Sequence, residues 1–208
     1  MNKKIYLLPI LLLALVFVSC EETKEVSIYD NWQERNEAFI DSLKVVYDNE
    51  TLDEEGRKLE RFELLSAPDN YMYYKRLTPV TGTPPDDKPY NYISGYKASE
   101  QQPLYTDTVS VYYKGTLINK QRFDGFTGEG PNVFDTTYRF CVSGVMGSSS
   151  GNGVIVGWTE ALQRMKLGER WEIYVPWKYA YGSNGSGSIL GYSTLIFDIQ
   201  LYDIEGYD

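Results

Sequence analysis

The stretch that decides the fold runs from residue 153 to 171 and reads Gly153-Val-Ile-Val-Gly-Trp-Thr-Glu-Ala-Leu-Gln-Arg-Met-Lys-Leu-Gly-Glu-Arg-Trp171. Two glycines, Gly157 and Gly168, bracket a helix-favouring segment, and a glycine after a helix suits the left-handed residue that ends it. The pattern therefore predicts a short helix over residues 158–167. After it we expect a strand, an aromatic loop at 175–182 and a closing strand at 193–201.

Outward from this stretch, most of the C-terminal region favours β-strands. The aromatic run 71–77 predicts a strand, and so does most of the chain from residue 105 onward. The prolines and glycines between them, in residues 78–103, favour loops. Together they predict an α+β fold, in which a curved antiparallel sheet wraps one short helix and is preceded by a helical N-terminal extension.

The predicted extension covers the charge-rich residues 29–65, with Asp30 as the expected N-cap. Apolar residues at helical spacing form a first stripe: Trp32, Phe39, Leu43 and Val46. After a break at residues 49–51, a second helical stripe is expected from Leu52, Leu59, Phe62 and Leu65. The first stripe has two possible partners, which are the C-terminal domain or a second copy in a homodimer.

The N-terminus has the pattern of an export signal. Lys3 and Lys4 precede an apolar run at 5–18, which is shorter than the ~20 residues that a membrane-spanning helix needs. A small residue and then Cys20 follow, an order that resembles a bacterial lipoprotein signal with Cys20 as the lipidated residue. We therefore expect a signal peptide at 1–19, an acidic linker and helical extension at 20–66, and a domain at 67–208.

The acidic residues just after Cys20 have two interpretations. They resemble the surface-export signals of Bacteroidetes lipoproteins, and they are also compatible with a solvated acidic linker. Either way, the predicted location is the bacterial cell envelope, with the protein lipid-anchored in the outer membrane and facing the periplasm or the surface.

Charge and composition exclude several classes of function. Removal of residues 1–19 takes away two lysines and no acid, so the net charge falls from −9 to −11, and nucleic acid is not an expected partner. The chain has no histidine, which excludes a Ser-His triad. Neither a metal nor another cofactor is predicted. Lipidation of Cys20 would leave Cys141 without an intrachain partner, as a buried core thiol.

Several separated motifs resemble the FKBP-type peptidyl-prolyl isomerases. Residues 107–115 read Asp-Thr-Val-Ser-Val-Tyr-Tyr-Lys-Gly, and Phe123-Asp124 follows. Val154-Ile155 with Trp158, then Tyr179-Ala-Tyr-Gly182, and finally Phe197 occur in the family's order. The resemblance covers residues 105–208, with a weaker continuation back to residue 71.

The resemblance implies an FKBP-like fold with an apolar pocket that accepts a proline side chain. The implied pocket residues are Tyr113, Phe123, Asp124, Ile155, Trp158, Tyr181 and Phe197. The implied further substrate contacts are Val154, Ile189 and Tyr138. Phe134-Asp135, followed by two threonines, is an alternative to Phe123-Asp124. The spacing from Tyr113 favours the first pair, and the threonines favour the second.

Two functions follow from the resemblance. The first is a lipid-anchored prolyl isomerase that assists the folding of exported proteins and acts on proline-containing polypeptides. The second is a non-catalytic FKBP-fold binding or chaperone module at the cell surface. The aromatic pocket residues favour catalysis. Three departures from the family pattern favour binding, namely Ile189-Leu190-Gly191 in place of Ile-Pro-Pro and the expanded loops at 125–133 and 143–153.

Overall fold

A computed structural model describes residues 27–144 and 153–206. All its helices and strands lie in one compact unit, Asn31–Asp208. The elements are α1 (Trp32–Asp48), β1 (Glu60–Leu64), β2 (Ala67–Leu77), β3 (Thr108–Leu117), β4 (Arg122–Gly125), β5 (Tyr138–Cys141), α2 (Val156–Leu162), β6 (Arg170–Val175), the 3-10 turn η1 (Trp177–Tyr179) and β7 (Leu195–Ile204). The predicted signal peptide and Cys20 lie outside the described residues.

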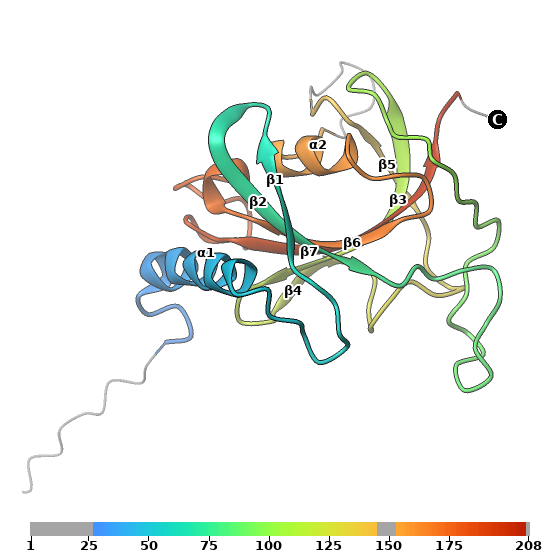
Figure 1. Cartoon of the computed structure of the whole chain (residues 1–208), viewed down its shortest axis with the longest axis horizontal. Coiled ribbons are helices and arrows are strands. Elements are labelled where there is room, and N and C mark those ends of the chain that lie inside the picture. The colour runs from blue at the N-terminus through green and yellow to red at the C-terminus, as the bar shows by residue number, and fades with distance from the viewer. Residues whose placement is uncertain (1–26, 145–152, 207–208) are drawn as a thin grey trace, which may run out of the picture. The chain divides into compact units, whose positions relative to one another are not determined.

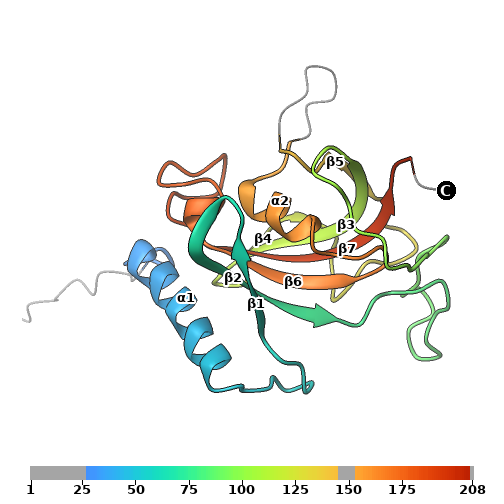
Figure 2. The same ribbon diagram turned by 45° about the horizontal axis from the view of Figure 1, so that its top comes forward.

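The described strands form one antiparallel sheet. Their order is β1-β2-β6-β7-β3-β4, and β5 also pairs with β3. Figures 1 and 2 show the sheet curving around α2, with α1 preceding it. The predicted α+β fold, a curved antiparallel sheet on one short helix after a helical extension, is thereby confirmed.

The core lies between the sheet and α2. The central strands β6 and β7 supply fully buried aliphatic side chains, among them Ile173, Leu195 and Ile199. The helix contributes Ala161 and Leu162, which are also fully buried. Burial of a large aliphatic side chain stabilises a fold by about 1.5–3 kcal/mol. This shared core therefore fixes the position of α2 over the sheet.

Helix α2 is shorter than the predicted 158–167 and begins earlier. Gly157 lies inside its first turn, where a Cβ atom would come within 2.4 Å of Val175 Cγ1. The helix ends at Leu162, and a turn follows in which the N–H groups of Arg164 (2.9 Å) and Met165 (3.1 Å) donate to the carbonyl of Ala161. The N–H of Leu167 donates to the carbonyl of Gln101 (2.8 Å), so tertiary pairing replaces the last predicted helical turn.

The first apolar stripe of the extension does form on a helix, and the chain's own domain covers it. Leu43 of α1 is buried with Leu59, Tyr73 and Tyr174, and Phe39 and Val46 pack against the same cluster. The helix begins after Asn31, which has a left-handed backbone (φ 50°), so the N-cap is not Asp30. Of the two partners expected for the stripe, the structure shows the intramolecular one.

The second predicted stripe does not form a helix. Residues 60–64 are instead strand β1, which pairs with β2. Leu59 is buried at 1% exposure, whereas Leu52 and Leu65 are 57% and 74% exposed, so the stripe is not one face. The predicted boundary between residues 66 and 67 therefore falls between two paired strands.

The turn between β1 and β2 is held by a carboxylate from α2. Glu160 is 3% exposed and accepts hydrogen bonds from the N–H groups of Leu65 (3.0 Å) and Ser66 (2.8 Å). Arg164 pairs with Glu160 (2.9 Å) and donates to the carbonyl of Glu63 (2.8 Å). A buried carboxylate needs such partners, so this contact joins the hairpin to the helix.

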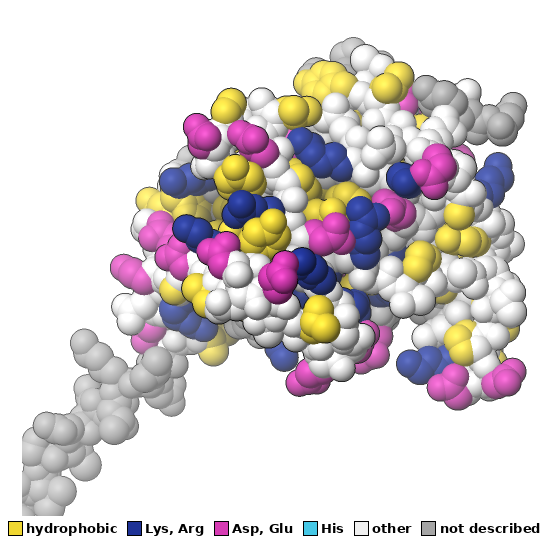
Figure 3. Space-filling view, viewed as in Figure 1, with side chains coloured by type: hydrophobic (Ala, Val, Ile, Leu, Met, Phe, Trp, Pro, Cys, Tyr) yellow, Lys and Arg dark blue, Asp and Glu magenta, His cyan; other side chains and the backbone are white. Residues whose placement is uncertain are grey.

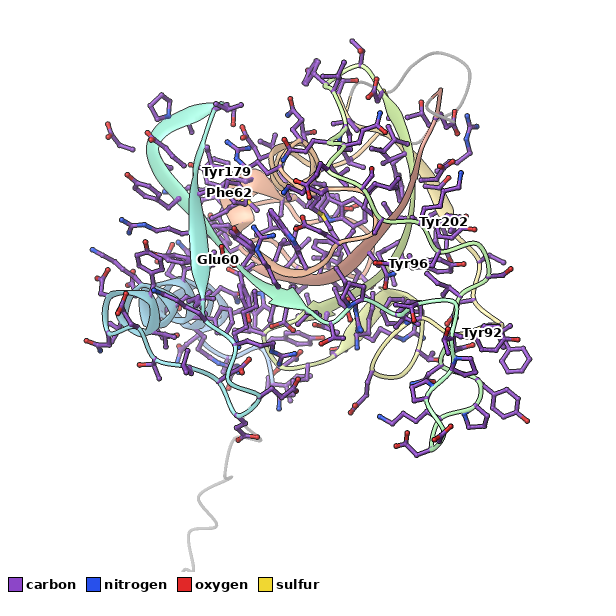
Figure 4. All side chains as sticks on the ribbon, turned by 45° about the vertical axis from the view of Figure 1, so that its right-hand side comes forward. Glu60, Phe62, Tyr92, Tyr96, Tyr179 and Tyr202 are labelled. Carbon is purple, nitrogen blue, oxygen red and sulfur yellow. The ribbon has the colours of Figure 1, made fainter. Side chains whose placement is uncertain are left out.

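The proline-rich segment 79–103 is a loop that packs against the end of the sheet. Figure 4 labels Tyr96 and Tyr202, which pack against one small cluster of Ile93, Tyr112 and Phe126. The Tyr202 hydroxyl donates to the carbonyl of Ser94 (2.8 Å). These contacts explain how a segment without regular structure keeps a defined position.

On the face shown in Figure 3, charges of both signs are interspersed rather than separated. Figure 3 shows Lys and Arg beside Asp and Glu, and pairs such as Lys58–Glu50 (2.8 Å) join them.

Within the residues that the structure describes, no helix is long and apolar enough to cross a membrane. Cys141 is a half-buried free thiol rather than a core residue, because the neighbouring Val142 takes the buried position.

Candidate active site

A cavity of about 330 Å³ lies between α2 and the sheet. Strands β3, β4 and β7, the N-terminus of α2 and the loop after β6 all contribute to it. Its lining within the described part of the chain is Tyr113, Phe123, Asp124, Phe140, Gly144, Gly153, Val154, Ile155, Trp158, Tyr181 and Phe197. All seven residues expected to form the pocket, and Val154, are brought together here.

The cavity is built around the indole of Trp158. Its ring meets those of Tyr113, Phe140 and Phe197 edge-on, with centroid distances of 5.1, 5.2 and 5.2 Å. Such edge-to-face contacts are favourable because the positive edge of one ring faces the negative face of another. Trp158 is 3% exposed and Phe197 is 4% exposed, so these rings are fixed by packing.

Phe123 reaches the cavity because Gly115 leaves room for it. A Cβ atom at Gly115 would lie 2.5 Å from the Phe123 ring and 3.0 Å from that of Phe197. The two phenyl rings are therefore able to meet edge-on, with centroids 5.6 Å apart. Strand β3 thus places a glycine where two walls of the cavity converge.

The polar side of the cavity contains a tyrosine–aspartate pair and a second tyrosine. The Tyr113 hydroxyl donates to Asp124 Oδ2 at 2.5 Å. Burial, and then the hydrogen bond to Asp124, raise the pKa of Tyr113. Burial, followed by the charge of Asp124, also raises the pKa of Tyr181. Both hydroxyls therefore remain protonated at neutral pH, and Tyr181 is able to donate a hydrogen bond.

The start of α2 adds backbone groups to the lining. Ile155 is the N-cap of the helix, and its carbonyl accepts from the N–H of Trp158 (2.9 Å). At this end of a helix the first N–H groups lack helical partners, so they are available as donors. Within the described residues, the buried Trp158 Nε1 also has no hydrogen-bond partner.

Two expected substrate contacts do not line the cavity in the described structure. Ile189 is 8% exposed and pairs with Ser186 across a tight turn, through N–H to carbonyl bonds of 2.9 Å in each direction. Its side chain is buried but is not among the described residues that line the cavity. Tyr138 contacts Tyr113 edge-on, with centroids 5.0 Å apart, and lines a smaller neighbouring cavity of about 130 Å³.

The two Phe-Asp pairs occupy different places. Phe123 and Asp124 line the main cavity, whereas Phe134 and Asp135 line the smaller one. Phe134 is 76% exposed and contacts Tyr90, with centroids 5.5 Å apart. The spacing argument from Tyr113 thus agrees with the geometry, and the threonine argument does not.

Sequence reasoning missed Phe140, Gly144 and Gly153. Phe140 lies two residues after Tyr138 on β5, and alternate residues of a strand share a face. Its ring meets that of Tyr113 edge-on, with centroids 5.8 Å apart. Placing Tyr138 at the pocket should therefore have placed Phe140 there as well. The two glycines flank the undescribed residues 145–152, and nothing in their sequence context indicates the cavity.

The lining supports binding of an apolar group more than bond-breaking chemistry. It contains one carboxylate and two phenols among aromatic and aliphatic walls. In the described ranges, 27–144 and 153–206, no three Cys, Asp or Glu side chains form a group that could hold a metal ion. The site is suited to enclosing a compact apolar ring while one or two donors face its polar neighbours.

Comparison with known proteins places the chain in a family. The profile described as FKBP-type peptidyl-prolyl cis-trans isomerase matches residues 99–202. The chain is 39% identical over 104 residues to the FKBP-type 22 kDa peptidyl-prolyl cis-trans isomerase of Escherichia coli, covering 49% of this chain and 43% of that protein. It is 37% identical over 105 residues to FkpA of Aeromonas hydrophila, covering 50% and 34% respectively.

The match is confined to part of each curated relative, since the chain spans less than half of their length. Among solved structures, FkpA from Escherichia coli aligns with a TM-score of 0.49 and 26% identity, covering 84% of this chain and 63% of that one. The family profile matches half of the sequence and includes every residue that lines the cavity. The chain therefore belongs to the FKBP-type peptidyl-prolyl cis-trans isomerase family.

Proposed function

We propose that the protein is a peptidyl-prolyl cis–trans isomerase that acts on proline-containing polypeptides. The observation that carries the proposal is the cavity of about 330 Å³. Aromatic side chains line it, among them the indole of Trp158, and Tyr181 also contributes to the lining. Membership of the family indicates prolyl isomerisation as the reaction, and the apolar cavity is suited to binding a proline ring.

The reaction requires no bond to break. Resonance gives the peptide C–N bond partial double-bond character, so rotation faces a barrier of ~18–20 kcal/mol. Uncatalysed X-Pro bonds therefore exchange over ~10–100 s. In the twisted amide resonance is lost, and the charge separation of the planar form disappears. A dry apolar cavity disfavours the planar, charge-separated form more than the twisted one, which lowers the barrier.

Each lining group has a proposed part in this process. The rings of Phe123, Trp158 and Phe197 exclude water and hold the proline. The Tyr181 hydroxyl and the Ile155 N–H are the proposed donors to the peptide carbonyls. The Tyr113–Asp124 pair orients the polar rim, and its hydrogen bond leaves the carboxylate occupied rather than available as a base.

A kinetic experiment tests this proposal. Every helix and strand in the described ranges lies after residue 31, so a chain of residues 21–208 retains them. Isomerisation of a short X-Pro peptide would be measured with this chain and with Phe197→Ala. We expect acceleration by the parent and loss of most of it in the variant. Leu65→Ala, at a 74% exposed position outside the cavity, is the control and should retain full activity. Equal rates with and without a folded parent would refute catalysis.

We further propose that the protein is lipid-anchored through Cys20 and assists the folding of exported proteins in the cell envelope. The order of charged, apolar and small residues before Cys20 supports this part of the proposal. The outer membrane, with the domain on its periplasmic or outer face, is the proposed location. Slow X-Pro exchange in newly exported chains is the step that such an enzyme would accelerate.

A non-catalytic binding module is the second candidate function. The observation that favours it is that Ile189, an expected substrate contact, is not among the described residues that line the cavity. Such a protein would bind proline-containing segments without accelerating their isomerisation. NMR exchange spectroscopy on an X-Pro peptide, with and without residues 21–208, separates the two candidates.

A homodimer through the N-terminal helices is a further proposal on assembly. Because the first stripe packs on the sheet, such a dimer requires the opposite face of α1, where Val45 is 58% exposed. Sedimentation of residues 21–208 beside the same chain with Val45→Asp is the test. A single protomer in the sedimenting species of the parent would refute the dimer.

A further inference from the structure

Outside the cavity, a buried polar contact joins α1 to the connection from β6 to β7. Asn36, in the middle of α1, is fully buried. Its Oδ1 accepts a hydrogen bond from the N–H of Thr194 (2.7 Å), and its Nδ2 donates to the carbonyl of Trp32 (2.7 Å). A buried amide is costly unless it is paired, so this asparagine fixes the relative position of the two segments.

A second contact runs parallel to the first. The indole Nε1 of Trp32 donates to Ser193 Oγ (2.9 Å), and the Ser193 hydroxyl donates to the carbonyl of Leu190 (2.7 Å). Ser193 and Thr194 are 3% and 0% exposed. The helix is therefore linked by buried hydrogen bonds to two consecutive residues and, through Ser193, to Leu190.

These contacts lie at the base of the loop formed by residues 176–194, here called the β6–β7 loop. The loop carries Tyr181, and its two ends are joined because the N–H of Tyr192 donates to the carbonyl of Gly182 (2.9 Å). The rings of Trp177 and Tyr192 also meet, with centroids 4.9 Å apart. Strand β7 begins immediately after Thr194 and carries Phe197 into the cavity.

We infer that α1 is a positioning element of the active site, in which Asn36 and Trp32 hold the base of the β6–β7 loop and thereby set the position of Tyr181. The inference rests on the proposed function for its kinetic consequence. Its structural consequence is independent of catalysis, because the same hydrogen bonds restrain the loop whether or not the protein is an enzyme. Trp32 and Asn36 thus belong to the functional module rather than to a spacer.

The kinetic test compares substitutions on one helix. Asn36→Ala removes the acceptor of the Thr194 N–H, and Trp32→Phe removes the indole donor while keeping an aromatic ring. Leu43→Ala is the matched control, because Leu43 packs on the sheet cluster with Leu59 and Tyr73 and has no bond to the loop. All variants are made in residues 21–208 and measured at a temperature where each is folded. We expect kcat/KM to fall about tenfold for Asn36→Ala, because the change removes one hydrogen bond. Leu43→Ala should remain within about twofold of the parent.

A double-mutant cycle shows whether Asn36 acts through Tyr181. If it does, Asn36→Ala should have little further effect on kcat/KM in a Tyr181→Phe background. An undiminished effect in that background would overturn the inference, as would a loss of activity in Leu43→Ala that matches the loss in Asn36→Ala at equal thermal stability.

Amide hydrogen exchange provides a readout that does not require activity. The amides of Gly182 and Tyr192 are bonded within the loop (2.9 Å each), and we expect them to exchange faster in Asn36→Ala than in Leu43→Ala. Equal exchange in both variants would overturn the inference even in an active enzyme. If the parent is inactive but the loop amides respond as expected, the proposed function fails while the positioning of the loop stands.

Discussion

At the scale of single residues, the proposed isomerisation depends on Tyr181 as a hydrogen-bond donor in an aromatic cavity. The side chain is 40% exposed, so removal of its hydroxyl should leave the fold intact. We expect Tyr181→Phe to lower kcat/KM by about tenfold, since a hydrogen bond contributes on the order of 1 kcal/mol. Peptide isomerisation kinetics together with thermal unfolding are the check. A large loss of thermal stability would instead assign Tyr181 to the core.

The tyrosines also predict the pH dependence of the reaction. The pKa values of Tyr113 and Tyr181 are raised, by burial first and by Asp124 second. A raised pKa keeps the hydroxyl protonated, so its donor is lost only when the pH rises above the ordinary tyrosine value of about 10. With no histidine in the chain, we expect kcat/KM to be constant from about pH 6 to 9. A decline with a midpoint below pH 9 would contradict this assignment.

Residue-scale prediction from sequence was strongest where several motifs constrained one another. Tyr113, Trp158 and Phe197 were expected together because their motifs occur in the family's order, and the cavity brings them together. Ile189 differed, because it is buried but does not line the cavity in the described residues, and motif spacing alone does not show this. Phe140 was missed although the alternation of β5 would have indicated it.

At the scale of elements, the contact between α2 and the β1–β2 turn predicts acid-sensitive stability. Burial alone would raise the pKa of Glu160, but the N–H groups of Ser66 and Leu65, with Arg164, lower it below its ordinary 4.5. A lowered pKa means that Glu160 stabilises the fold above about pH 4.5 and that this stabilisation is lost as the pH falls below that value.

Glu160→Gln should therefore lower the free energy of unfolding at pH 7 by about 1–3 kcal/mol, because it weakens the bonds to the buried turn. The difference from the parent should be smaller at pH 3 than at pH 7, because the parent carboxyl loses its charge as the pH falls below about 4.5. Urea unfolding at the two pH values measures this. Glu100→Gln, in an exposed pair with Lys166, is the control and should change little. An equal difference at both pH values would contradict the role of the charge.

Element prediction succeeded for α1 and failed for β1. The stripe of α1 is a local signal, since helical spacing alone places Trp32 and Leu43 on one face. The identity of β1 depends on β2 and on Glu160, which is 95 residues from Leu65 in the chain. Helical and strand patterns are hard to separate in a short segment, and tertiary pairing decided this one.

At the scale of the whole molecule, the proposed lipid on Cys20 would attach the domain that holds the cavity to the membrane. Conversion of Cys20 to alanine should move the protein from the membrane fraction to the soluble fraction of the expressing bacterium, because the anchor is the only predicted membrane attachment. Activity of the purified domain should be unchanged, since residue 20 precedes every described element. Cell fractionation with metabolic lipid labelling is the measurement. Equal membrane association of both proteins would refute the anchor.

The most direct test of the central claim is exchange spectroscopy by NMR on an X-Pro peptide with a substoichiometric amount of residues 21–208. If the cavity catalyses isomerisation, cis and trans signals will exchange much faster than the uncatalysed ~10–100 s. The Trp158 indole resonance will shift on addition of peptide. A shifted indole with exchange at the uncatalysed rate would contradict the enzyme and identify a binding module.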